Sequence, residues 1–141
     1  MRGLLLVLAL LVSAASFAAG THRIVFQVND NEPARMNLVL NNVANLNKHY
    51  QDKGEEAQIE VVAYGPGLTM LNAAASPVKD RVKSFGQNYD NVKFLACGNT
   101  MAKIKKKTGK DVPLVEGVKV VPGGVVHITE REEEGWTYLK P

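Results

Sequence analysis

Short runs of β-branched and aromatic residues alternate with helical patterns along most of this chain, and that alternation constrains its fold more than any other feature. Runs of the first kind predict five strands, at residues 23–28, 58–63, 92–96, 118–121 and 136–139. Helical spacing and cap residues predict four helices between them: after Pro33, after an N-cap at Ser76 with Pro77 in the first turn, over 99–107 and over 124–133.

Strands that alternate with helices need crossover connections, and crossovers produce a mostly parallel sheet covered on both faces. The predicted fold class is therefore α/β: a three-layer α/β/α sandwich with a five-stranded, mostly parallel sheet, flavodoxin-like in size. In such sheets the loops that follow the strands meet at the carboxyl edge, where ligands bind. We therefore look for a functional site in those loops.

The first twenty residues have the three parts of a secretory signal. Arg2 precedes an apolar run at 4–11 and small residues at 13–20. The alternative, a membrane anchor, needs about 20 apolar residues, more than this run offers. We expect a signal peptide at residues 1–20, cleaved after Ala18 or Gly20, a single domain at 21–141, a periplasmic location and no membrane attachment after cleavage.

The charge balance argues against a nucleic-acid partner, because the net charge is only +3 and nucleic-acid binding requires a dominant basic face. The one basic cluster is interpreted as a solvated helix surface: Lys103, Lys105, Lys106, Lys107 and Lys110. A ridge of asparagines four residues apart in the first helix is either solvated or a subunit contact: Asn37, Asn41 and Asn45.

The chain has one cysteine, Cys97, so no intramolecular disulfide can form. Cys97 follows a predicted strand and precedes a predicted helix, and a helix N-terminus lowers the pKa of a thiol. We expect Gly98 to leave the approach to the sulfur open. The alternative is a small buried hydrophobe, a common role of free cysteine. The histidines show no metal-ligand spacing, so no metal or cofactor is predicted, and a pair between His127 and Cys97 is disfavoured against a half-exposed helix histidine.

Four segments carry a family resemblance: DNEPARMNLVLNNVANL, EVVAYGPGL, VKFLACGNTM around Cys97, and VKVVPGGVVHITEREEEGWTYLKP. In this order they resemble the exported branch of the DsrE/DsrF-like sulfur-relay family. The resemblance implies the same α/β/α sandwich and assembly as trimers or hexamers. It also implies that Cys97 matches the cysteine that carries sulfur as a persulfide between partner proteins in cytoplasmic relatives.

Our leading functional hypothesis is a sulfur carrier without turnover of its own, which exchanges sulfur with a donor or acceptor protein through Cys97. The expected supporting residues are backbone donors after the cysteine and groups on neighbouring loops: Gly98, Asn99, Thr100, Tyr64, Gly65 and Asn29. The competing hypothesis is an oligomeric binding or assembly module in which Cys97 is buried and inert. A thioredoxin-like reductase is disfavoured because the chain has no C-x-x-C.

Overall fold

The structure is a computed structural model that describes residues 20–141. The predicted signal peptide lies outside the described residues except for Gly20, so its cleavage stays a prediction. Among residues 20–141, no helix is both long and apolar enough to cross a membrane.

A five-stranded sheet forms the centre of the fold, and every neighbouring pair of strands is parallel. The strand order is β4-β3-β2-β1-β5. The predicted strands are confirmed, with ends shifted by at most one residue: β1 His22–Val28, β2 Ala57–Ala63, β3 Val92–Cys97, β4 Lys119–Val121 and β5 Thr137–Leu139.

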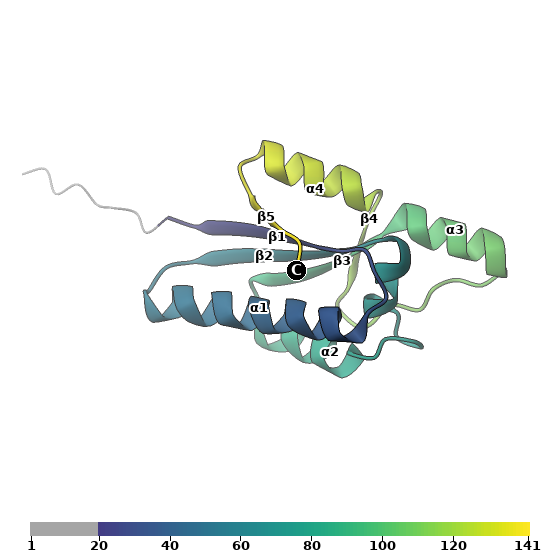
Figure 1. The fold of residues 1–141 in the computed structure, drawn as a ribbon, viewed down its shortest axis with the longest axis horizontal. Helices are drawn as coiled ribbons and strands as arrows, with labels where there is room; N and C mark the ends of the chain where they lie inside the picture. The colour runs from purple at the N-terminus through teal and green to yellow at the C-terminus, as the bar shows by residue number, and fades with distance from the viewer. Residues whose placement is uncertain (1–19) are drawn as a thin grey trace, which may run out of the picture.

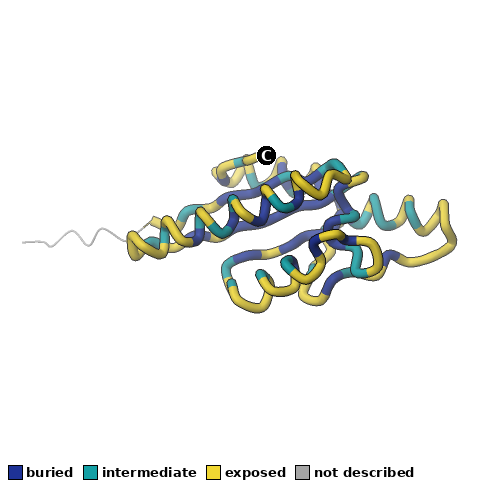
Figure 2. Tube along the Cα trace, turned by 60° about the horizontal axis from the view of Figure 1, so that its bottom comes forward, coloured by how far each residue is buried: buried dark blue, intermediate teal, exposed yellow. Residues whose placement is uncertain are grey.

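Helices cover both faces of this sheet, which confirms the predicted α/β/α sandwich. The helices are α1 Pro33–Asp52, the 3₁₀ helix η1 Gly65–Leu71, α2 Lys79–Asn88, α3 Gly98–Thr108 and α4 Gly124–Glu133. Figure 1 shows α1 and α2 on one face, α4 alone on the other, and α3 projecting beyond the carboxyl edge. No residue of α3 is buried, and its exposure stands out in Figure 2. Met101 and Ile104 are partly buried and pack against the main core.

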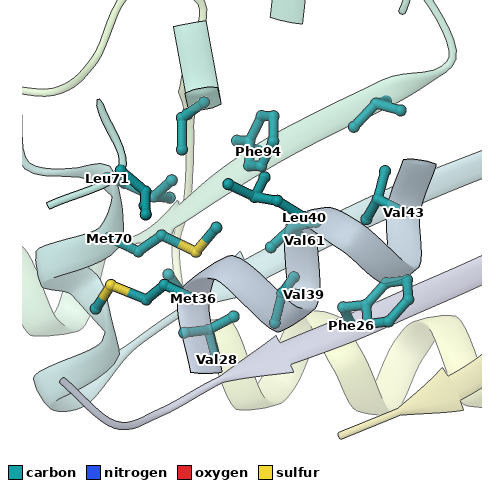
Figure 3. Close-up of a cluster of buried hydrophobic side chains, with 14 of the residues drawn as sticks. Phe26, Val28, Met36, Val39, Leu40, Val43, Val61, Met70, Leu71 and Phe94 are labelled. Carbon is teal, nitrogen blue, oxygen red and sulfur yellow. The ribbon is translucent and has the colours of Figure 1, made fainter. Parts of the chain in front are cut away.

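The larger core lies between the sheet and the α1/α2 face. Its fully buried side chains include Phe26, Met36, Leu40, Val61 and Met70, which belong to the one cluster drawn in Figure 3. Because side chains alternate along a strand, the other face has its own, smaller core beneath α4: Val25, Val62, Leu95, Ile128 and Trp136. The side chain of Cys97 belongs to this second face, two residues after Leu95.

One local prediction needs correction. The helix predicted from Pro77 begins at Lys79, because the Ser76 hydroxyl accepts from the Val78 N–H (3.2 Å) and donates to the Met70 carbonyl (2.6 Å), which ties this turn to η1.

Part of the asparagine ridge has an intramolecular partner. The Arg81 guanidinium of α2 donates to the side-chain oxygens of Asn37 (2.7 Å) and Asn41 (2.9 Å) on α1. These bonds join the two helices on one face, so this part of the ridge is neither simply solvated nor free for another subunit.

Candidate functional site

Cys97 is the last residue of β3 and the N-cap of α3. Because β3 lies between β2 and β4, the loops that follow these two strands flank the cysteine, one on each side. The first loop begins with Tyr64, and the second contains Gly123 and Gly124. The predicted placement of Cys97 at a strand end and a helix start is therefore confirmed.

The sulfur of Cys97 is buried and hydrogen-bonded. The residue is only 5% exposed, and the Gly124 N–H donates to Sγ over 3.2 Å. Burial raises the pKa of the thiol, but hydrogen bonds from the Thr100 side chain and from the backbone N–H groups of Gly124, Thr100 and Asn99 outweigh it. The net effect is a pKa below the ordinary value for cysteine.

The expected open approach to the sulfur is absent, and the reason is close packing of Gly124. A Cβ at position 124 would lie 3.0 Å from the Tyr64 Cβ and 3.3 Å from the Cys97 Cβ. The glycine thus lets three strand-end loops meet and brings its N–H to the sulfur. The same contact closes the site over Cys97.

Gly98 also has a packing role rather than the predicted role in access. A Cβ there would lie 3.1 Å from the Val121 carbonyl oxygen and 3.3 Å from that of Pro122. The neighbouring Asn99 N–H donates to the same Pro122 carbonyl over 3.1 Å. The first turn of α3 is therefore held against the end of β4.

Thr100 connects the cysteine to η1. Its hydroxyl oxygen accepts from the Gly65 N–H over 2.9 Å, and its side chain lowers the pKa of the Cys97 thiol. The structure therefore places Gly98, Asn99, Thr100 and Tyr64 beside Cys97, and Gly65 is linked to them through Thr100. Asn29 is not among them: it follows β1, one strand beyond β2, and its backbone nitrogen packs on Gly67 of η1.

A hydrogen-bonded chain anchors Tyr64 from the other side. The Gln27 amide donates to the Tyr64 hydroxyl and accepts from the Tyr138 hydroxyl of β5. The pKa of Tyr138 is raised, mainly by burial and to a smaller extent by the nearby Tyr64 and Glu132. The last strand thus supports the wall of the cysteine site, a link that the sequence did not predict.

A second polar cluster lies under α4, away from Cys97. Glu60 of β2 is 4% exposed, and its carboxylate accepts from Arg131 at both oxygens (2.9 and 3.0 Å) and contacts His127 Nε2 at 2.6 Å. Arg131 also lies over the Trp136 ring, 4.7 Å from its centroid. His127 therefore pairs with Glu60 and not with Cys97.

Burial raises the pKa of Glu60, but hydrogen bonds from Arg131 and His127, together with their charges, lower it below the ordinary value. A carboxylate within an apolar strand, and a histidine and an arginine four residues apart on a later helix, were the available signals in the sequence. Within residues 20–141, no group of three or more His, Cys, Asp or Glu side chains could hold a metal ion.

Comparison with known proteins adds two findings. The model of the DsrE/DsrF-like family matches residues 22–141. A solved structure, described as the protein of unknown function MTH1491 from Methanobacterium thermoautotrophicum, is similar at 36% sequence identity with a TM-score of 0.72, covering 85% of this chain and 99% of that one. No curated protein matches the chain.

Proposed function

The chain belongs to the DsrE/DsrF-like family, which is associated with sulfur relay, and on that premise we propose that it is an exported sulfur carrier that uses Cys97. The observation that supports the proposal is the set of donors converging on the Cys97 sulfur, which lowers the pKa of the thiol despite its burial. A thiolate is the form that attacks sulfane sulfur.

The proposed step needs no outside oxidant or reductant. The Cys97 thiolate attacks the outer sulfur of a persulfide R–S–SH, and a new sulfur–sulfur bond forms while the old one breaks. R–S⁻ leaves with the electron pair, and the proton stays on the transferred sulfur, so the product is a Cys97 persulfide. Attack by a partner's thiolate on that outer sulfur passes it on and regenerates the Cys97 thiolate.

The test measures the rate of iodoacetamide alkylation of Cys97 against pH. Burial slows the absolute rate, but the midpoint of the curve reports the pKa, which we expect below the free value of about 8.5. Thr100→Val removes one donor and should move the midpoint upward, whereas Thr69→Val, the same change in η1, should leave it in place. Incubation with a persulfide donor should add about 32 Da, one sulfur atom, and Cys97→Ser should abolish the gain.

The competing function is an assembly module with an inert Cys97, and the 5% exposure of that residue favours it. On this hypothesis the alkylation rate still rises past pH 8.5 and no mass is gained. A destabilised Cys97→Ser variant would support it further, because a hydroxyl would then be buried in an apolar site. Those results together would exclude the carrier.

We also propose that the protein is a homo-oligomer, a trimer or hexamer. Three exposed valines beside the cysteine loops support this proposal: Val120 of β4 (53% exposed), Val125 (57%) and Val126 (59%) of α4. Light scattering should give a multiple of the monomer mass, roughly 13 kDa for a domain of this size. Val126→Lys should shift the mass toward the monomer, and Leu38→Lys, at an exposed leucine of α1, should not. A monomer at tens of micromolar would refute the proposal.

A further inference from the structure

A groove between α3 and η1 is lined at one point by Thr100. Its volume is about 300 Å³, at the lower end of the range for sites that bind small molecules. Leu68 of η1 and Ile104 of α3 give it an apolar surface, and Asn72 and Thr100 contribute polar groups.

The charge of this groove is unbalanced. Lys103 and Lys107 both line it, and none of its lining residues within the described chain is acidic. On the same helix, Lys105 is paired with Asp111 at 2.9 Å. In residues 20–141, Lys103 and Lys107 form no such ion pair, so their ammonium groups remain available to an anion.

The placement of these lysines follows from helix geometry. Thr100, Lys103, Ile104 and Lys107 occupy positions i, i+3, i+4 and i+7 of α3, which form one stripe on a helix. A stripe that faces the rest of a protein is normally apolar, but here half of its positions are cationic. This stripe suits a ligand that carries negative charge on a small apolar frame.

Thr100 joins this groove to the cysteine. Its side chain lines the groove, accepts from the Gly65 N–H and lowers the pKa of the Cys97 thiol. The groove and the cysteine site therefore share Thr100.

We propose that this groove binds a small organic anion with carboxylate groups, held by Lys103 and Lys107, and that this anion is the low-molecular-weight thiol whose persulfide supplies sulfur to Cys97. The proposal that the groove binds an anion is independent of the proposed function. The identification of that anion as the sulfur donor rests on the proposed function. The anionic end explains the lysines, and the apolar frame explains Leu68 and Ile104.

The experiment titrates the protein with S-methylglutathione, which has two carboxylates and a thioether in place of the thiol, so it cannot transfer sulfur. Calorimetry should show saturable binding, and NMR amide shifts should map to α3 and η1. Binding should weaken as the ionic strength rises to about 0.15 M, where screening acts over roughly 8 Å. N-acetyl-S-methylcysteine amide, which is uncharged, should not bind.

A matched pair of variants tests the role of the two lysines. Lys103→Gln with Lys107→Gln should weaken binding by at least about fivefold. Lys106→Gln with Lys110→Gln removes the same charge from exposed positions outside the groove and should change it by less than about twofold. Equal losses in both double variants, or no saturable binding by the wild type, would overturn the proposal. Binding of an eight-residue glutamate peptide in place of S-methylglutathione would also overturn it, in favour of an acidic protein partner.

The experiments distinguish failure of the anion-binding proposal from failure of the sulfur-carrier proposal. Cys97→Ser should bind S-methylglutathione as the wild type does, since the probe does not need the sulfur. Binding without any gain of sulfur on Cys97 would retain the anion site and remove its identification as the donor site. Formation of a persulfide on Cys97 without binding of the probe would support the sulfur-carrier function and refute anion binding in the groove.

Discussion

Replacing Glu60 by glutamine should destabilise the protein strongly. The loss should exceed that from neutralising any single charged side chain of α4 or any other charged residue that pairs with α4. Glu60 is 4% exposed and bonds both Arg131 and His127. Removing one partner of a buried pair costs about 3–5 kcal/mol, because the remaining charge is left buried without compensation. Here the Arg131 side chain is 26% exposed and keeps its bond to Glu134 (2.8 Å), which reduces that penalty. We therefore expect a loss of about 2–3 kcal/mol in the free energy of unfolding.

The assay is urea unfolding followed by circular dichroism, with Glu133→Gln, at an exposed glutamate of α4, as the control. The control should lie within about 0.5 kcal/mol of the wild type. The Glu60→Gln variant should also melt roughly 10 °C lower. A loss no larger than that of the control would refute the reasoning, because it would show that this pair does not hold α4 on the sheet.

The pH dependence supplies an independent check. The pKa of Glu60 is lower in the folded protein than its ordinary value of 4.5, so the folded state favours the charged carboxylate. Its contribution to stability is then complete above pH 4.5 and is lost as the pH falls through the folded pKa. The difference between wild type and Glu60→Gln should shrink over that window, and a difference that grew on acidification would have the wrong sign.

Two further predictions concern the cysteine site and the N-terminus. Gly124→Ala places a Cβ 3.0 Å from Tyr64, so it should cost about 1–3 kcal/mol in urea unfolding and move the alkylation midpoint of Cys97 upward. Gly86→Ala, on α2 with no atom within 4 Å of the new Cβ, should instead stabilise by about 0.5–1 kcal/mol, and similar losses in both variants would contradict the packing argument. Intact-mass measurement of exported protein should place the N-terminus at Ala19 or Thr21, and retention of residues 1–20 would exclude the signal peptide.

The strands were predictable because each is an apolar, β-branched run whose burial on the sheet follows from its own residues. The position of Cys97 was predictable for the same reason, since it depends only on where β3 ends and α3 begins. The features that the sequence did not predict depend on contacts between distant parts of the chain. Glu60 and Arg131 are 71 residues apart, and nothing near Glu60 reveals its partner.

The glycines of the site show the same limit. The local sequence predicted that Gly98 leaves an open approach to the sulfur. The structure shows instead that Gly98 permits close contact with the carbonyl of Val121, at the end of β4, and with that of Pro122, which follows it. The exposure of a side chain depends on which loops meet over it, and strand order determines that. The sequence pattern predicts the strands but does not fix their order.

The position of β5 in the sheet has a consequence for how the chain assembles. β1 pairs with β2 on one side and with β5 on the other. Both edges of β1, which is synthesised early, are therefore paired only after β5 has been synthesised. A protein chain emerges from the ribosome N-terminus first, and its early strands can pair while β1 still has a free edge. Gly124, which donates to the Cys97 sulfur, and Tyr138, which supports Tyr64 through Gln27, both follow Cys97 in the chain. A nascent chain that has already exposed its only cysteine therefore lacks the Gly124 N–H, one of the donors that lower the pKa of the thiol, until synthesis has passed β4 and reached α4.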